Sequence, residues 1–271
     1  MLAATGETGR KPRLRMAKSL AQRHGYTCVI MSTPYYGRRK PAHQYSFYLE
    51  TVSDMWRQYG AVVQETAAMA EYFLRQHVPN DDCRVCITGF SAGACLALCA
   101  AWTCVTGYRI ADASNRVTVA AHATPASAAV FVSGSVRYLM DWQALRGDEP
   151  QESLETTRKL LQQELDLLSV RQAVALGGDS LDSGNPRLGS IQCTVFKHDC
   201  VSPPGEAQVL AEILPAMTTN DAALDWLAGG HVMAYWIRPQ WQNRLIVRAL
   251  ASLRQQHDRC ERLLPCTDTF T

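Results

Sequence analysis

Long apolar runs are missing from this chain of 271 residues, and so are internal repeats and low-complexity linkers. No stretch reaches the roughly 18 apolar residues that indicate a transmembrane helix. Charge of one sign is also missing, because 27 basic and 25 acidic residues give a formal net charge of only +2. We therefore expect no membrane span and no nucleic-acid partner. Peripheral contact with a membrane stays open.

Cysteine is plentiful, at ten residues, but it lacks the spacing of a metal site. Cys83 and Cys86 form a C-x-x-C pair without a second pair at zinc-finger spacing. Residues three apart in a strand also point to opposite faces, which favours core packing over a ligand pair. We predict no metal and no cofactor. The scattered thiols favour a reducing compartment, and hence an intracellular protein of the cytoplasm or the mitochondrion.

The remaining pattern is that of one α/β domain. The composition is 47% hydrophobic and 19% charged, as in soluble globular proteins, and the length is ample for a sizeable core. Short apolar runs alternate with helical stretches, which predicts a mainly parallel sheet flanked by helices. The predicted strands are 26–31, 84–88, 117–123, 191–196 and 222–227, and the predicted helices are 12–24, 51–76, 92–104, one opening at Pro203, and 240–256.

Residues 124–189 interrupt this rhythm. They contain one amphipathic stretch, 152–168, and then a loop rich in Gly, Asp and Ser. We expect residues 1–123 and 190–271 to form the core and 124–189 to form a small helical cap or lid. In the last helix we expect an inward stripe of Trp241, Leu245, Ile246, Ala249 and Leu253.

The strongest local motif is Gly89-Phe90-Ser91-Ala92-Gly93, which matches G-x-S-x-G. It lies between a predicted strand and a predicted helix, the context in which a serine is lifted clear of a sheet as a nucleophile. The alternative is an incidental Gly-Ser turn. A nucleophilic serine needs a base and an orienting acid, so the rest of the chain must supply both.

Three histidines, His122, His198 and His231, follow predicted strands, where active sites of parallel sheets gather. Only His231 comes after both a serine and an acid, in the order this architecture uses. Asp199 ends the strand before last and is our candidate acid, with Asp221 and Asp225 as rivals at less suitable positions.

Two further sets of residues complete the predicted site. The oxyanion donors would be the amides of Ala92 and Thr5, the latter in the loop after residues 1–4. Arg38, Arg39 and Lys40 follow the strand 26–31, so their loop should open beside Ser91 and could hold an anionic part of a substrate. The alternative is a solvated basic loop. His122 is expected either to line the substrate pocket or to be a satisfied structural residue.

With these residues in place, the chain resembles the α/β hydrolases, and more narrowly the family of α/β-hydrolase-domain-containing protein 18. The likeness lies in residues 2–7, in 34–41 with Pro-Tyr-Tyr-Gly-Arg-Arg-Lys-Pro, in the serine motif, and in Gly229-Gly230-His231-Val232. Ala4 replaces a glycine that is usual in the oxyanion loop of the family. The resemblance implies two more strands before Met1, so we expect either a misassigned start or a shortened form, with any targeting signal upstream. The basic residues 1–20, which also suit a transit peptide, are then a strand and a helix.

The function expected from these residues is that of a serine hydrolase cleaving a carboxylic ester through an acyl-enzyme. A small-molecule ester or a lipid ester would be the substrate, the lipid being suggested by the apolar residues 128–132 of the predicted cap. Acyl transfer or peptide cleavage by the same residues stays open. So does a non-catalytic binding module that keeps the fold.

Overall fold

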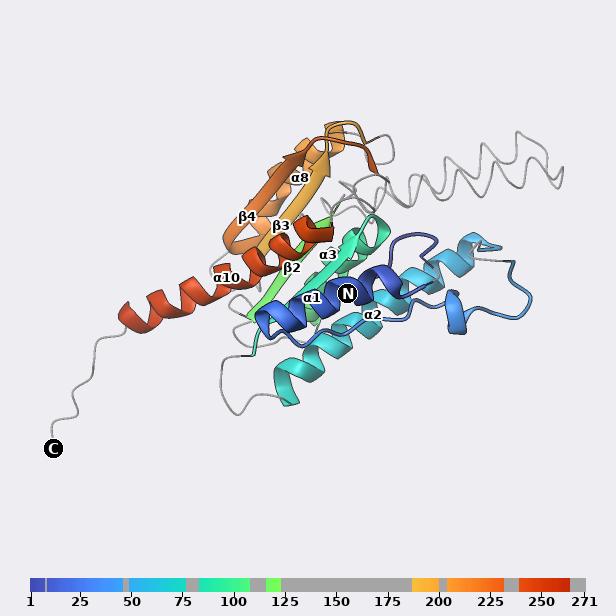
Figure 1. Ribbon diagram of the computed structural model, residues 1–271, viewed down its shortest axis with the longest axis horizontal. Coiled ribbons are helices and arrows are strands. Elements are labelled where there is room, and N and C mark those ends of the chain that lie inside the picture. The colour runs from blue at the N-terminus through green and yellow to red at the C-terminus, as the bar shows by residue number, and fades with distance from the viewer. Residues whose placement is uncertain are drawn as a thin grey trace.

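The structure is a computed structural model that describes residues 1–7, 9–45, 49–76, 83–107, 116–122, 187–199, 204–231 and 239–263. Its sheet contains β1 (Val85–Phe90), β2 (Val117–His122), β3 (Leu188–Phe196) and β4 (Thr218–Leu227), ordered β1-β2-β3-β4 and parallel throughout (Figure 1). The predicted parallel sheet is therefore confirmed. Since all four strands run the same way, their carboxyl ends share one edge.

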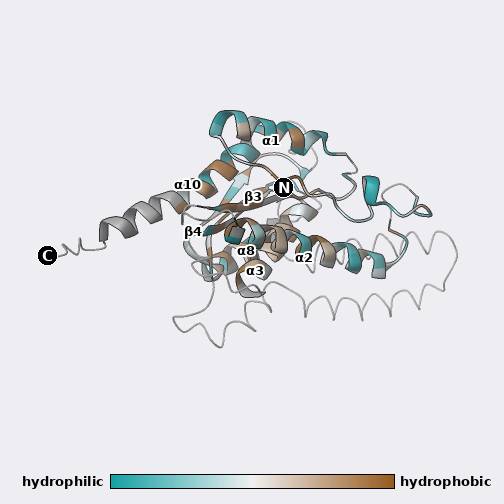
Figure 2. Cartoon of the chain, turned by 90° about the horizontal axis from the view of Figure 1, so that it is seen from below, coloured by the Kyte–Doolittle hydropathy of each residue, from teal (hydrophilic) through white to brown (hydrophobic). Residues whose placement is uncertain are grey.

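Helices cover both faces of this sheet (Figures 1 and 2). On one face, α2 (Val52–Gln76), α3 (Ala92–Gly107) and α8 (Pro204–Met217) pack with Val117, Val119 and Ala121 in one apolar cluster. On the other face, α1 (Lys11–His24) and α10 (Pro239–Leu263) enclose Ala120. This alternation along β2 follows from the two-residue period of a strand and explains its continuous apolar sequence.

The first residues of the chain lie beside β1 and link it to the segment 26–31. Leu2 pairs with Gly89 in a parallel bridge, and its amide donates to the carbonyl of Thr88 at 2.8 Å. On its other side, the amide of Met31 donates to the carbonyl of Met1 at 3.1 Å. The prediction of a strand over 26–31 is wrong as stated, because these residues form no ladder and bond to residue 1 only at Val29 and Met31.

The ends of the predicted elements shift by a few residues. Gly25, expected to cap α1, adopts a left-handed φ of 69° and does so. In α10, four residues of the predicted inward stripe are buried, but Trp241 is 40% exposed, so its placement was wrong. Of the predicted cap, residues 124–186 lie outside the described residues, and Leu188 already belongs to β3. No helix within the described ranges is long and apolar enough to cross a membrane.

Candidate active site

Ser91 occupies the turn between β1 and α3. Its φ is 54°, a left-handed conformation that is uncommon for a residue with a side chain. The turn is nevertheless fully bonded: the amide of Ser91 donates to the carbonyl of His122 at 2.8 Å, and the Ser91 carbonyl accepts from Ala94 at 2.9 Å and Cys95 at 3.2 Å. These bonds at the end of β1 and the start of α3 hold the serine in its strained conformation.

The two glycines of the serine motif are required by close backbone contacts. A Cβ atom on Gly89 would lie 2.2 Å from the carbonyl oxygen of Gly93, and one on Gly93 would lie 2.6 Å from the carbonyl oxygen of Ala3. Both distances are far below van der Waals contact. The pattern G-x-S-x-G therefore follows from packing β1, α3 and residues 2–3 together around one sharp turn.

The register of β3 and β4 brings Asp199 to His231. Phe196 is paired with Leu227, and the two strands stay joined beyond the ladder, because the amide of Lys197 donates to Leu227 at 2.9 Å. The loops that follow therefore leave the sheet side by side. Gly229 turns its loop with a φ of 120°, which favours glycine, and His231 follows two residues later.

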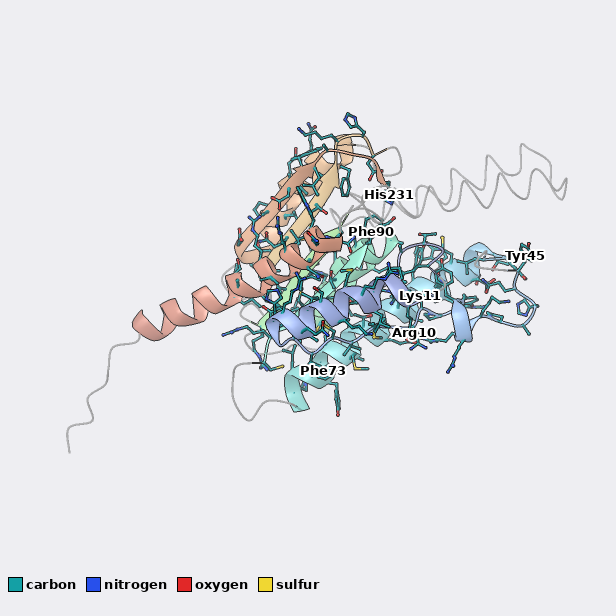
Figure 3. The ribbon with its side chains drawn as sticks, viewed as in Figure 1. Arg10, Lys11, Tyr45, Phe73, Phe90 and His231 are labelled. Atoms are coloured by element: carbon teal, nitrogen blue, oxygen red, sulfur yellow. The ribbon has the colours of Figure 1, made fainter. Side chains whose placement is uncertain are left out.

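The structure brings the three predicted side chains together in one relay. Nε2 of His231 lies 2.7 Å from Oγ of Ser91, and Nδ1 lies 2.6 Å from a carboxylate oxygen of Asp199. All three are buried, at 6%, 3% and 8% exposure for Ser91, Asp199 and His231. The ring centroids of Phe90 and His231, both labelled in Figure 3, lie 5.4 Å apart. In this geometry the imidazole can take a proton from the hydroxyl while the carboxylate fixes its orientation.

The rival residues are engaged elsewhere. Asp225 pairs with Arg248 of α10 at 3.2 Å, and Asp221 accepts from Gln192 at 2.7 Å and from Ser252 at 3.0 Å. The side chain of His198 is exposed. Neither rival carboxylate contacts an imidazole among the described residues, which leaves Asp199 as the acid beside His231.

Residues 4–7 form a tight loop whose amides are nearly all used. The amide of Ala4 donates to the Glu7 carboxylate at 3.2 Å, that of Gly6 to the Tyr36 hydroxyl at 3.1 Å, and that of Glu7 to the Ala4 carbonyl at 3.2 Å. Within the described part of the chain, the Thr5 amide has no acceptor. The amide of Ala92, at the first position of α3, has none either. The two predicted oxyanion donors are thus amides without an acceptor among the described residues.

A buried ion pair beneath this loop was not expected from the sequence. Nε of Arg13 lies 2.8 Å from the Glu7 carboxylate, with both side chains almost wholly buried. The same guanidinium donates to the carbonyl of Met31 at 2.6 Å and to that of Met1 at 3.3 Å. Arg13 therefore links α1 to the loop 4–7, to Met1 and to Met31. The sequence feature that could have indicated this pair is the charged Arg13 on the apolar face of the predicted helix 12–24.

Tyr36 fixes the loop from the other side. Its ring is buried, and burial raises the pKa of its phenol, so the hydroxyl stays protonated at neutral pH. Buried Gln58 of α2 holds the same segment by donating to the carbonyl of Pro34 at 2.8 Å. The Pro-Tyr-Tyr-Gly sequence thus places the neutral hydroxyl of Tyr36 where it accepts a hydrogen bond from the Gly6 amide.

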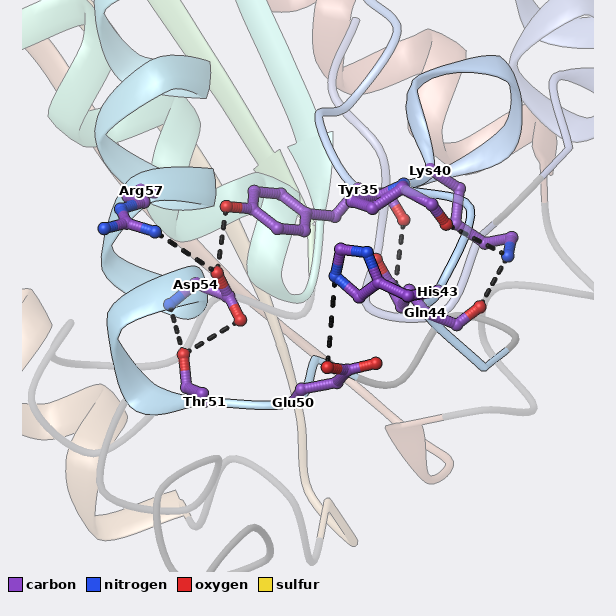
Figure 4. Close-up of polar contacts among 9 residues, drawn as sticks. Tyr35, Lys40, His43, Gln44, Glu50, Thr51, Asp54 and Arg57 are labelled. Carbon is purple, nitrogen blue, oxygen red and sulfur yellow. Dashed lines mark hydrogen bonds and ion pairs between the residues drawn. The ribbon is translucent and has the colours of Figure 1, made fainter.

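The neighbouring tyrosine anchors this segment to the start of α2 (Figure 4). Tyr35 has a left-handed φ of 64°, and its hydroxyl donates to Asp54 at 3.1 Å. Asp54 is itself bonded to Thr51, whose hydroxyl accepts from the Asp54 amide at 3.0 Å in the manner of a helix cap. Gln44 closes the loop with a 3.2 Å bond to the Tyr35 carbonyl. Hydrogen bonds at several points therefore hold the segment 34–44 in place.

The basic residues of the segment 34–44 have different surroundings. Arg39 forms a two-pronged pair with Glu65 of α2, with both N–O distances 2.6 Å, and also donates to the Ser32 carbonyl. Lys40 donates to the Gln44 carbonyl at 2.5 Å, whereas Arg38 is exposed in η1 (Gly37–Arg39). Arg39 is therefore already neutralised. Binding of a substrate anion by Arg38 and Arg39 stays a prediction.

His122 lies behind Ser91 and is 3% exposed. Its Nε2 has no hydrogen-bond partner in the structure, and burial lowers its pKa to about 3, so the ring is neutral at physiological pH. It borders a small cavity of about 10 Å³ together with Arg13 and Gln242. The structure thus gives His122 a supporting contact through its carbonyl, and its contact with a substrate stays a prediction.

No group of three His, Cys, Asp or Glu side chains in the described ranges is arranged to hold a metal ion. Free thiols are found at Cys28, Cys83, Cys86, Cys95, Cys99, Cys104 and Cys193. Cys86 lies in β1, where burial raises the pKa of its thiol to about 12.

Comparisons with solved structures found several similar chains. An esterase of Pyrococcus furiosus aligns with a TM-score of 0.52 at 14% identity, covering 92% of this chain and 81% of that one. The type II thioesterase of the borrelidin biosynthetic cluster aligns at 0.46 and 19% identity, covering 93% and 90%. A putative non-heme bromoperoxidase of Mycobacterium tuberculosis aligns at 0.49 and 18%, covering 93% and 91%. None of the curated proteins matches the chain.

The likeness to the esterase shows the fold, which is the α/β-hydrolase fold. A closer assignment comes from the sequence families. Residues 1–182, two thirds of the chain, match the family described as alpha/beta hydrolase domain containing 18. They include the loop 4–7, the Pro-Tyr-Tyr-Gly segment and the serine turn. This chain belongs to the alpha/beta hydrolase domain containing 18 family.

Proposed function

We propose that this protein is a serine hydrolase that cleaves a carboxylic ester through an acyl-enzyme, with Ser91 as nucleophile, His231 as general base and Asp199 as the orienting acid. The observation that carries the proposal is the relay with distances of 2.7 Å and 2.6 Å. A binding protein would have no need to bury these three polar groups in one line, because burying polar groups is costly unless they serve one another.

In the proposed reaction, the Ser91 hydroxyl gives its proton to Nε2 of His231 while Oγ attacks the ester carbonyl carbon. Asp199 holds Nδ1–H and stabilises the imidazolium that forms. The tetrahedral intermediate collapses as Nε2 returns the proton to the leaving alkoxide, so that an alcohol departs and Ser91 is acylated. Water then attacks the acyl carbonyl carbon and gives one proton to Nε2. As the second tetrahedral intermediate collapses, Nε2 returns this proton to Oγ of Ser91, so that a carboxylic acid departs and the free hydroxyl is restored.

The amides of Thr5 and Ala92 are the proposed donors to the oxyanion of the tetrahedral intermediate. Two observations support this: neither amide has an acceptor among the described residues, and Ala92 is the first residue of α3, where the helix dipole favours negative charge. The bonds from Glu7 and Tyr36 use up the neighbouring amides. These hydrogen bonds therefore fix the conformation of the loop 4–7 before substrate binds, and the Thr5 amide needs little reorganisation during the reaction.

The decisive experiment is labelling with a fluorophosphonate probe, which reacts only with an activated serine. We expect the wild-type chain to be labelled, and Ser91→Ala to lose both label and ester turnover while keeping its circular dichroism spectrum. Ser32→Ala is the matched control, because the Ser32 side chain is exposed and only its carbonyl is used. An unlabelled wild-type chain would favour a binding module.

The substrate is proposed to be a small-molecule or lipid ester. Residues 128–132, which suggested a lipid, lie outside the described residues, so esters of increasing acyl length should be compared directly. An added amine or alcohol acceptor separates hydrolysis from acyl transfer, because a transferase would form the new amide or ester in preference to the acid. A peptide cleaved at a rate comparable to the best ester would instead identify a peptidase.

A further inference from the structure

Residues 4–7 form a four-residue turn of a recognisable type. The amide of Glu7 donates to the Ala4 carbonyl at 3.2 Å, and the Glu7 carboxylate accepts from the Ala4 amide at 3.2 Å. Gly6, at the third position, has a φ of 73°. A positive φ at this position is typical of a type II turn and favours glycine there. The two ends of the turn are therefore bonded to each other.

The ends of the turn are also bonded to the body of the protein. Before it, the amide of Leu2 donates to the Thr88 carbonyl of β1 at 2.8 Å. At its end, the Glu7 carboxylate pairs with Arg13 of α1 at 2.8 Å. Neither contact reaches the two central residues. These contacts consequently set where the turn lies, but they do not set how its central peptide is oriented.

Within the described part of the chain, one hydrogen bond holds the middle of the turn. The central peptide joins Thr5 to Gly6, and its N–H donates to the Tyr36 hydroxyl at 3.1 Å. Type I and type II turns differ by a rotation of this peptide, so the bond selects the type II form. Rotation would exchange the directions of N–H and C=O and would change the backbone angles of Thr5. The orientation of the Thr5 amide therefore depends on this bond.

Tyr36 is itself held rigidly. It is 8% exposed, and its hydroxyl is also hydrogen-bonded to the side chain of Gln58. Gln58 is 2% exposed in α2, and its amide nitrogen donates to the Pro34 carbonyl at 2.8 Å. A buried hydroxyl with partners on two sides does not turn away easily, because a buried polar group without a partner is unfavourable. Tyr36 thus links the Gly6 amide to α2.

We propose that Tyr36 is a positioning residue of the hydrolytic reaction, which holds the central peptide of the turn through Gly6 and so aims the Thr5 N–H at the oxyanion. The inference rests on the proposed function, because it needs Thr5 as an oxyanion donor. It assigns the direction of this donor to Tyr36 and not to the pair of Glu7 with Arg13. In this role the hydroxyl bonds to the protein, so its loss should affect turnover and not substrate binding.

The test removes one hydroxyl at a time from the full chain. Tyr36→Phe keeps the buried ring but leaves the Gly6 amide without its acceptor. We expect kcat for a p-nitrophenyl ester to fall at least about tenfold and KM to change less than about twofold, because an oxyanion donor acts on the transition state. Equal kcat in Tyr36→Phe and wild type, or a rise in KM alone, overturns the proposal.

Tyr35→Phe is the matched control, because it removes the neighbouring hydroxyl from the same segment. That hydroxyl donates to Asp54 at the start of α2 (Figure 4). We expect Tyr35→Phe to lower the melting temperature and to leave kcat near wild type. Melting temperatures of both variants therefore separate a loss of stability from a loss of turnover. If Tyr35→Phe lowers kcat as much as Tyr36→Phe does, the segment acts only through stability and the proposal is wrong.

A second measurement reports on the oxyanion directly. An alkyl trifluoromethyl ketone is attacked at its carbonyl carbon by Oγ of Ser91, the hydroxyl proton passes to Nε2 of His231, and the carbonyl oxygen becomes an oxyanion. Because this adduct resembles the transition state, Tyr36→Phe should weaken inhibition by about the same factor as it lowers kcat. Inhibition of Tyr35→Phe should match wild type. Unchanged inhibition of Tyr36→Phe overturns the proposal.

Fluorophosphonate labelling separates this inference from the proposed function. The expected result is complete labelling of Ser91 in wild type and in both variants, with kcat reduced only in Tyr36→Phe. If all three chains are labelled and have equal kcat, only the role of Tyr36 is refuted. If the wild-type chain is unlabelled and cleaves no ester, the proposed function is refuted and this inference with it.

Discussion

Substitution of Gly93 by Ala tests the link between the serine turn and the loop 4–7. The new methyl carbon would lie 2.6 Å from the Ala3 carbonyl oxygen and 3.0 Å from that of Leu2. Relief of the first contact needs a movement of roughly half an ångström or more, since such atoms normally stay more than about 3 Å apart. Gly93 lies in the first turn of α3 and cannot easily retreat, so residues 2–3 must move outward and carry the Thr5 amide with them.

Two magnitudes follow from this movement. Overpacking of this kind costs about 1–3 kcal/mol of unfolding free energy. Loss of one oxyanion donor lowers kcat by about 10²–10³-fold, so partial displacement of Thr5 should cost at least about tenfold. We expect kcat to fall while KM changes little, because the donor acts mainly on the transition state.

The assay pairs urea unfolding with steady-state hydrolysis of a p-nitrophenyl ester. Gly60→Ala is the matched control: a Cβ there meets no atom within 4 Å, and Ala in the interior of α2 should raise stability by about 0.5–1 kcal/mol. Gly93→Ala with wild-type stability and wild-type kcat would refute the close packing of α3 on residues 2–3. Loss of stability with unchanged kcat would refute the role of the Thr5 amide.

Further predictions concern the acid, the loop and the buried histidine. Asp199→Asn should lower kcat by about 10⁴-fold with the fold retained, and Asp225→Asn, which removes only an exposed pair, should leave kcat near wild type in the same assay. Arg38→Ala should raise KM for an anionic ester and spare a neutral one, and equal KM values would make η1 a solvated turn. His122 has a folded pKa of about 3 against 6.5 unfolded, so the wild type should lose up to about 1.4 kcal/mol of stability per pH unit as pH falls below 6.5. Urea titrations of His122→Leu should show a shallower acid loss, and parallel curves would contradict the burial of an unprotonated ring.

The sequence was sufficient for the parts of the fold and the site that depend on local pattern. Alternation of apolar runs predicted the parallel sheet, and chain order together with strand ends selected Ser91, Asp199 and His231, which the structure brings together. Contacts between residues far apart in the sequence could not be predicted. The partner of Arg39 is Glu65, 26 residues away on another element, and no spacing rule connects them. The ion pair of Glu7 with Arg13 was missed for a related reason, since burial of a charge is visible only once its neighbours are placed.

Two errors have a common physical cause. The segment 26–31 has the composition of a strand, but it bonds to its neighbour only around Met1. A strand requires a bonded partner along its length, which composition does not reveal. Trp241 satisfies the helical period of α10 but stands in its first turn and is 40% exposed, whereas Leu245 and Ala249 are buried in a cluster with Ala120 of β2. Periodicity predicts the face of an element. It does not predict how far the neighbouring layer extends.

The parallel order β1-β2-β3-β4 has a consequence for how activity would be lost. Ser91 follows β1, which pairs with β2 on one side and carries the bridge from Leu2 on the other, whereas His231 follows β4, the last of the described strands. Terminal strands open in local fluctuations that leave the core intact. Separation of β4 from β3 would break the relay while α2 and α3 stay packed on β1 and β2. Heating should therefore inactivate the enzyme several degrees below the midpoint of its cooperative unfolding, and activity should return on cooling from that range.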